Sequence, residues 1–100
     1  MISEKLIPKM FKALGHPIRY DIVKFLLDGE KCVCKLNENI EFSQSNLSQH
    51  LKILKEAGLL KSKKYGLNIH YSIANDEVKK LVQAADKFIE CHLKEMQNNC

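Results

Sequence analysis

Apolar residues recur at every third or fourth position between residues 43 and 57, which predicts an amphipathic helix packed on a core. The apolar face holds Leu47, Leu51, Ile53, Leu54 and Ala57. Ser43 is placed to cap the N-terminus of this helix, and Gly58 is placed to end it. The opposite face carries amides, hydroxyls and an imidazole, whereas an ordinary solvated helix would carry a mixture of glutamate and lysine.

Such a polar face is typical of a helix that reads DNA in the major groove. Amides, hydroxyls and imidazole can hydrogen-bond to base edges, while lysine pairs with phosphate. We therefore expect base contacts from Ser45, Asn46, Ser48, Gln49 and His50. Ser43 and Gln44 are expected near phosphate at the helix N-terminus, and Lys52 on the DNA backbone. The alternative is a helix that is merely solvated in a small bundle.

Three helical patterns precede this stretch. Residues 3–14 carry an apolar stripe made of Leu6, Ile7, Met10, Phe11 and Leu14. A second helix is predicted from Pro17 to the Asp28-Gly29 pair. A short third helix is predicted over residues 32–40, followed by a tight turn at Glu41-Phe42. A short helix, a turn of about three residues and a polar-faced helix together form a helix-turn-helix, here over residues 32–57.

After Gly58 the apolar period changes to two, which predicts a β-hairpin over residues 60–73 with Gly66 in its turn. Its tip carries Lys63, Lys64 and Asn68, a composition typical of a wing that lies over the DNA backbone or the minor groove. A last helix begins near Asn75, and its apolar stripe continues for about five turns to Met96.

The predicted fold is therefore mostly α with a β-hairpin wing: four helices, two strands and a last helix, in one winged helix-turn-helix domain over residues 1–100. A single domain of this size has few residues left to cover the long apolar stripe of the last helix. We therefore expect a homodimer through the first and last helices. The alternative is a last helix that packs back on its own domain. Two such subunits would place two recognition helices on a palindrome.

The net charge of +4 matters through its placement. Residues 43–71 hold five lysines and one glutamate, while the rest of the chain is balanced, which favours a polyanionic partner such as double-stranded DNA. We expect no signal peptide, membrane segment or second domain, and a cytoplasmic protein whose four cysteines are reduced. We find neither a paired nucleophile and base nor a phosphate-binding glycine loop in the sequence, so we do not expect an enzyme.

These motifs resemble the ArsR/SmtB family of winged-helix, metal-responsive repressors. The resemblance rests on residues 11–19 (FKALGHPIR), on Cys32-Val33-Cys34, on residues 43–60 (SQSNLSQHLKILKEAGLL) and on residues 70–73 (HYSI). It implies a homodimer that binds operator DNA without effector and releases the DNA when an inducer binds. No permanent cofactor is implied.

The resemblance also implies that Cys32 and Cys34 are thiolate ligands, since they match the Cys-x-Cys of arsenite- and cadmium-sensing members. As(III) or another soft metal ion is then the inducer. Two residues two apart on a regular helix project about 200° apart, so binding one ion there would require the helix start to unwind. Lys31, Lys35 and the nearby helix N-terminus should favour thiolate. The alternative is that both cysteines are small apolar fillers.

The chain also departs from its relatives. Asn37 replaces a third cysteine of the arsenite-type pattern, and the N-terminus lacks the cysteines of cadmium-type members. Of the zinc-type pattern on the last helix, His92 and Glu95 match one half, but Lys79 and Leu81 occupy the other, so no zinc centre is expected there. Cys100 stays unassigned.

The role of Cys91 is left open. It is a possible third metal ligand, or the partner of Cys32 or Cys34 in a thiol-redox or persulfide-responsive repressor. A constitutive DNA-binding module with inert cysteines is the remaining alternative.

Overall fold

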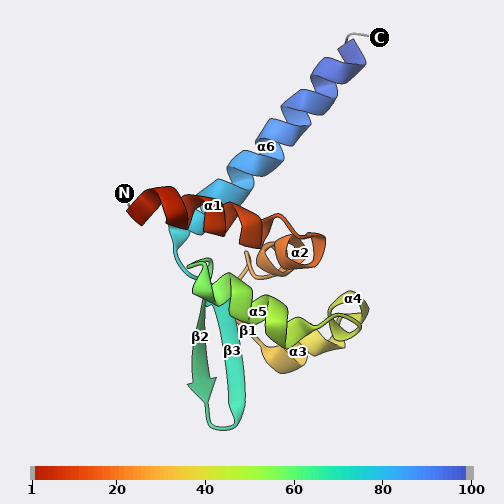
Figure 1. Cartoon of the computed structure of the whole chain (residues 1–100). Coiled ribbons are helices and arrows are strands. Elements are labelled where there is room, and N and C mark those ends of the chain that lie inside the picture. Colours follow the sequence, from red (N-terminus) through yellow and green to blue (C-terminus); the bar gives the residue numbers. More distant parts are fainter. Residues whose placement is uncertain (1, 99–100) are drawn as a thin grey trace.

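A computed structural model of the chain describes residues 2–98, which form helices around a small antiparallel sheet (Figure 1). The elements in chain order are α1 (Ile2–Leu14), α2 (Pro17–Phe25), β1 (Lys31–Cys32), α3 (Val33–Glu38), α4 (Ile40–Ser43), α5 (Leu47–Glu56), β2 (Leu60–Tyr65), β3 (Asn68–Ile73) and α6 (Asp76–Asn98).

The predicted hairpin is confirmed. β2 and β3 pair antiparallel from Leu60 opposite Ile73 to Tyr65 opposite Asn68, and Gly66 takes the positive φ of 61° that the turn requires. A third strand, β1, pairs with the other edge of β3, so that Cys32 lies opposite His70. The sequence did not predict β1, because two residues are too few to show a period.

The segment between α2 and α5 differs from the prediction. α2 ends at Phe25, and turns that include Gly29 lead the chain to β1. The predicted helix over residues 32–40 is wrong in its bounds, because Cys32 belongs to β1 and the helical part ends at Glu38. Asn39 has an extended backbone that ends α3, and its side-chain oxygen accepts hydrogen bonds from the amides of Glu41 and Phe42, which starts α4.

The prediction that Ser43 caps the recognition helix is also wrong. Ser43 is the last residue of α4, and its hydroxyl donates to the carbonyl of Ile40. Asn46 occupies the N-cap position of α5 instead. Ser43 does not cap α5 because Phe42 is only 2% exposed, and the burial of Phe42 gives residues 40–43 their own helical turn.

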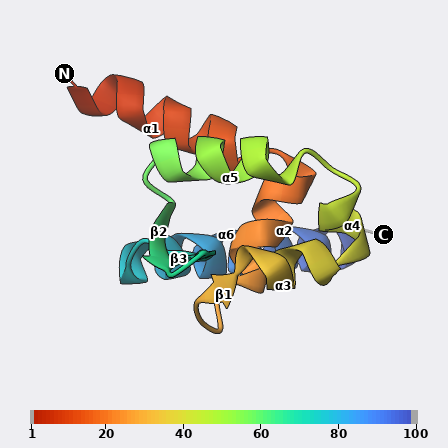
Figure 2. The same ribbon diagram turned by 90° about the horizontal axis from the view of Figure 1, so that it is seen from below.

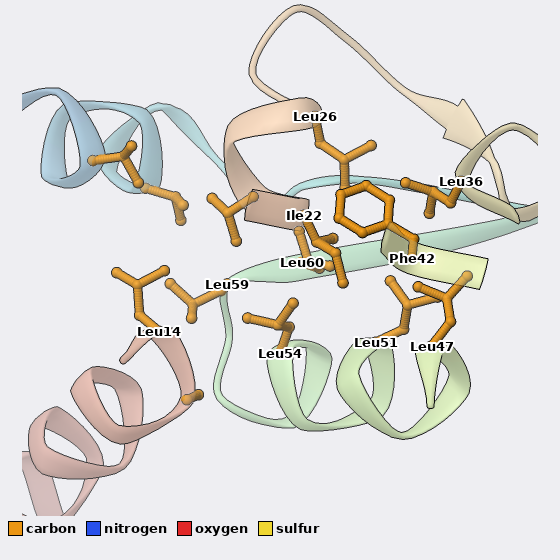
Figure 3. Close-up of a cluster of buried hydrophobic side chains, with 14 residues drawn as sticks. Leu14, Ile22, Leu26, Leu36, Phe42, Leu47, Leu51, Leu54, Leu59 and Leu60 are labelled. Atoms are coloured by element: carbon orange, nitrogen blue, oxygen red, sulfur yellow. The ribbon is translucent and has the colours of Figure 1, made fainter. Parts of the chain in front are cut away.

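The core joins α5 to the rest of the domain (Figure 3). Leu54 and Leu51 of α5 point toward Ile22 of α2, while Phe42 lies between α5 and Leu36 of α3. All five side chains are at most 2% exposed. The buried face of α5 is thus fixed against its neighbours, which leaves its other face for contact with a partner.

The predicted start of the last helix is confirmed, since the side-chain oxygen of Asn75 accepts hydrogen bonds from the amides of Glu77 and Val78. Val78 and Val82 are buried on the domain, and the rest of α6 projects away from it (Figure 1). Large apolar side chains are exposed on this projecting part and on α1: Leu6, Ile7, Phe11, Phe88, Ile89, Leu93 and Met96. Among residues 2–98, none of the helices combines the length and apolar character needed to cross a membrane.

A polar cluster sets how α6 leaves the domain. The Asp86 carboxylate accepts hydrogen bonds from the Lys24 ammonium and, at 2.7 Å, from the Tyr20 hydroxyl. The hydrogen bonds from Lys24 and Tyr20 lower the pKa of Asp86. Burial, with a smaller contribution from Asp86, raises the pKa of Tyr20 to about 12. These two hydrogen bonds join α2 to α6 through one carboxylate.

We predict that Asp86→Asn lowers the free energy of unfolding at pH 7. A carboxyl group whose pKa is lowered by folding stabilises the folded state above its unfolded pKa of about 3.9, and this contribution is lost as the pH falls through the folded value. The difference between wild type and variant should therefore shrink as the pH falls toward 3. Urea unfolding between pH 3 and pH 7 measures it, with Glu95→Gln on the same helix as control. A difference that is constant with pH would contradict this role.

Candidate nucleic-acid interface and cysteine pair

The exposed face of α5 carries Ser48, Gln49 and Lys52, opposite the buried leucines. Asn46 is exposed at the N-cap position, and its side chain makes no capping hydrogen bond. Its amide therefore remains available for a base edge, as do the side chains of Ser48 and Gln49. The structure brings these three polar residues together at the N-terminal half of one helix, with Lys52 one turn further on.

The residues expected just before them do not belong to α5: Ser43 is the last residue of α4, and Gln44 and Ser45 lie in the turn that follows. The Ser45 hydroxyl donates to the Phe42 carbonyl at 2.8 Å, and the Ser43 hydroxyl is engaged with Ile40 at 3.0 Å. Gln44 is exposed beside them. The two serines therefore stabilise the end of α4, while Gln44 stays accessible at the edge of the polar face.

His50 lies apart from this face, half-buried against α2. Its ring centroid is 4.7 Å from that of His16, and its Nδ1 is 3.4 Å from a guanidinium nitrogen of Arg19. Burial lowers the pKa of His50, and the charges of His16 and Arg19 lower it further. His50 is consequently a neutral contact between α2 and α5 at neutral pH, a role that the spacing of polar residues did not indicate.

The hairpin places its lysines beside α5. Lys61, Lys63 and Lys64 are exposed, and the Lys63 ammonium lies 5.2 Å from the centroid of the Tyr65 ring. Lys55 of α5 donates a hydrogen bond of 2.8 Å to the Ser62 hydroxyl, which ties the helix to β2. Asn68 is exposed next to the turn. The wing and the polar face of α5 are thus held in one fixed arrangement.

Cys32 and Cys34 come together where β1 meets α3. The structure joins their sulfurs in a disulfide, with the Cα atoms 5.1 Å apart. The expectation that the two side chains project in different directions is wrong, because Cys32 is the extended N-cap residue of α3 and not part of the helix. Its Sγ accepts a hydrogen bond of 3.1 Å from the amide of Cys34. The two sulfurs therefore meet without any unwinding of the helix.

The lysines expected to stabilise a thiolate are engaged elsewhere. Lys31 pairs with Asp28 and lies 5.0 Å from the centroid of the Phe25 ring, and Lys35 is 3.3 Å from Glu38. The group that donates a hydrogen bond to the Cys32 sulfur is the amide of Cys34. Cys32 also lies opposite His70 of the wing, whose Nδ1 is 3.7 Å from the Glu30 carboxylate. The cysteine pair is therefore built into both the wing sheet and the first helix of the helix-turn-helix.

The other candidate ligands lie away from this pair. Cys91 is exposed on α6, and Cys100 lies outside the described residues. The His92 ring stacks on Phe88, with centroids 6.5 Å apart. Within residues 2–98, three or more histidine, cysteine or acidic side chains do not converge on one possible metal position. Cys91 of the same subunit is thus not positioned as a third ligand.

A helix-turn-helix with an exposed polar face, followed by a lysine-rich hairpin, defines a winged helix-turn-helix DNA-binding protein. The sequence pattern described as the arsR family of bacterial regulatory proteins matches residues 16–62. An uncharacterized HTH-type transcriptional regulator of Methanocaldococcus jannaschii is 40% identical over 80 residues, covering 79% of this chain and 90% of the relative. A homolog of the cadmium resistance regulator CadC from Staphylococcus aureus is 41% identical over 80 residues, covering 79% and 66%.

Solved structures agree with these matches. Rv0081 of Mycobacterium tuberculosis has a TM-score of 0.83 and 31% identity, with 96% of this chain and 98% of that chain covered. The homodimeric winged helix-turn-helix domain of Mb0332 from Mycobacterium bovis has a TM-score of 0.79 and 25% identity, with 94% and 87% covered. This chain belongs to the ArsR family of transcription regulators, and family and fold are those of DNA-binding proteins and not of enzymes.

Proposed function

We propose that this protein is a homodimeric cytoplasmic repressor that releases a palindromic operator when Cys32 and Cys34 bind a thiophilic metal or metalloid ion such as arsenite. The observation that carries the proposal is the meeting of the two sulfurs at the junction of β1 and α3. The relatives support the general class, since one is a homolog of a cadmium resistance regulator and one is a homodimer.

In the proposed complex α5 lies in the major groove. Asn46, Ser48 and Gln49 read base edges, with Gln44 and Ser45 beside them, and Lys52 meets phosphate. Lys63, Lys64 and Asn68 of the wing contact the DNA backbone. His50 is left out of the base-reading set because its side chain packs on His16 and Arg19. Ser43 is left out of the phosphate contacts because its hydroxyl is bonded to the carbonyl of Ile40.

We predict different effects for Gln49→Ala and Lys64→Ala on DNA binding. An operator can be obtained by selecting duplexes from a random library with the wild-type protein. Gln49→Ala should lower discrimination at one base pair by about 1–3 kcal/mol. Lys64→Ala removes one phosphate contact from each subunit of the proposed dimer. It should therefore weaken every duplex and reduce the slope of log K against log salt by about 1.8. Fluorescence anisotropy at several salt concentrations measures both, and equal slopes for wild type and Lys64→Ala would contradict the wing assignment.

In the proposed inducer reaction two molecules of a small cellular thiol first reduce the Cys32–Cys34 disulfide to two thiols and are themselves oxidised to a disulfide. Both protein thiols then act on one arsenite. Each thiol proton leaves with one hydroxyl of As(OH)₃ as water, and each sulfur forms a bond to arsenic, while the third hydroxyl remains. This matches a site with two thiols and no third protein ligand among residues 2–98. The two sulfur–arsenic bonds would link β1 to α3, so that arsenite binding acts on the wing and on the helix-turn-helix together. Arsenite would fit this pair differently in the DNA-bound and in the released form of the protein. This difference supplies the differential affinity that an inducer requires.

Oxidation of the same pair is a second candidate function, favoured by the disulfide between Cys32 and Cys34. The two thiols would lose two protons and two electrons to an oxidant such as a peroxide. Reduced protein bound to operator should be titrated with arsenite and, separately, with the peroxide, and intact mass should be recorded at each step. Release at the mass of an arsenic adduct supports the first function, and release with a loss of two hydrogens supports the second.

A further inference from the structure

A pocket of about 220 Å³ lies between α1 and α5, on the side of α5 away from the wing. Its cationic lining consists of Lys9, Lys12 and Arg19, with Glu56 as the one carboxylate and Ile53 and Ala57 on its floor. Three cations against one carboxylate leave this side of the recognition helix positive. A charge count along the sequence does not show this, because these residues are distant from α5 in the chain.

The three cations have different roles. Arg19 is occupied within the protein, since it donates to the carbonyls of Ala13 and Lys12 and approaches His50. It therefore fixes the end of α1 to α5. Lys9 and Lys12 are exposed, and in the described part of the chain neither forms an ion pair. Their ammonium groups are available to an anion outside the protein.

The position of these lysines matches the width of a DNA groove. α1 lies along one side of α5 and the wing along the other (Figure 1). The major groove is about 12 Å wide, close to the diameter of a helix with its side chains, about 10–12 Å. Elements that flank a helix in this groove must therefore lie over its two phosphate walls. The wing lysines meet one wall, and the lysines of α1 face the other.

We propose that Lys9 and Lys12 contact DNA phosphates on the wall of the major groove opposite the wing. This inference rests on the proposed placement of α5 in the groove. The exposed apolar residues of α1, such as Ile7 and Phe11, lie outside the pocket lining and stay free for a second subunit. A phosphate strand is the partner favoured over a small organic anion, because the neighbouring face of α5 is the one that meets DNA.

The test is the salt dependence of operator binding by Lys9→Ala/Lys12→Ala. Each subunit of the proposed dimer loses two phosphate contacts, four in all, which should reduce the slope of log K against log salt by about 3.6, with base preference unchanged. Lys9→Arg/Lys12→Arg should keep the wild-type slope. Lys79→Ala/Lys80→Ala removes the same charge from exposed positions on α6, which lies on the other face of the domain from α5 (Figure 2), and should also keep it.

Urea unfolding of each variant establishes that the fold is intact, as expected for exposed lysines. Lys64→Ala is measured in parallel to separate two kinds of failure. A wild-type slope for the α1 double variant, with a reduced slope for Lys64→Ala, would overturn this inference alone and leave a small organic anion as the occupant of the pocket. Wild-type slopes for both variants would overturn the proposed placement of α5 and the wing as well.

Discussion

Operator binding by Cys32→Ser/Cys34→Ser will be as tight as that of the wild type, and arsenite will no longer weaken it. Serine keeps the size of cysteine, and its hydroxyl can accept the hydrogen bond that Cys32 takes from the Cys34 amide. The serine hydroxyl cannot bind arsenic as a cysteine thiolate does. The wild-type protein should lose about 5- to 150-fold in operator affinity on adding arsenite, the usual range of allosteric coupling. Anisotropy titrations with and without arsenite measure this difference.

Cys91→Ser is the matched control. It removes the exposed cysteine of α6. Release by arsenite should be unchanged, because two thiols of one junction suffice in the proposed site. Arsenite release that persists in Cys32→Ser/Cys34→Ser would sink the proposed inducer site. Loss of release in Cys91→Ser would instead show that a cysteine of a second subunit is needed.

The long elements of this fold could be predicted because they repeat their pattern. α1, α5 and α6 show apolar residues at helical spacing, and the apolar residues of β3 alternate with polar ones from Ile69 to Ile73. Each pattern runs long enough for its period to be read from the chain alone. The helix-turn-helix, the wing and the polar face of α5 followed from these patterns.

The short elements between Leu26 and Asn46 could not be predicted in the same way. β1 is two residues long and exists because it pairs with β3, which lies far along the chain. α4 is four residues long and follows the burial of Phe42. Tertiary contacts decide both, and the error at Ser43 came from reading a cap from local sequence only. Asn46, a good N-cap residue three positions later, was the signal that the sequence offered.

The chemistry of single side chains was the part hardest to read from sequence. Neighbours in sequence suggested that Lys31 and Lys35 act on the thiols, whereas their ammonium groups pair with Asp28 and Glu38. His50 was taken as a base contact, but His16 and Arg19 from another element enclose it. The two lysines pair with carboxylates three residues away in the chain. His50 instead has neighbours from another element, which the spacing of residues along one helix does not specify.

Leu93→Glu will convert the protein to a monomer and weaken operator binding by about 10²-fold or more, because the gain from binding two half-sites at once is lost. Leu93 is 53% exposed on the projecting part of α6, beside other exposed apolar residues. In the proposed dimer this surface is covered by the second subunit, so a carboxylate there would be buried without a partner. The folded domain should persist, since Leu93 is not part of its core.

Gln83→Glu adds the same charge at an exposed position of the same helix and should leave the dimer intact. Sedimentation equilibrium reports the mass of each variant, and anisotropy compares a whole palindrome with a single half-site. The monomer should bind both duplexes with similar affinity, because it can occupy only one half-site at a time. A dimeric Leu93→Glu protein with wild-type operator affinity would show that α6 does not join the subunits, and the exposed stripe would then require another partner.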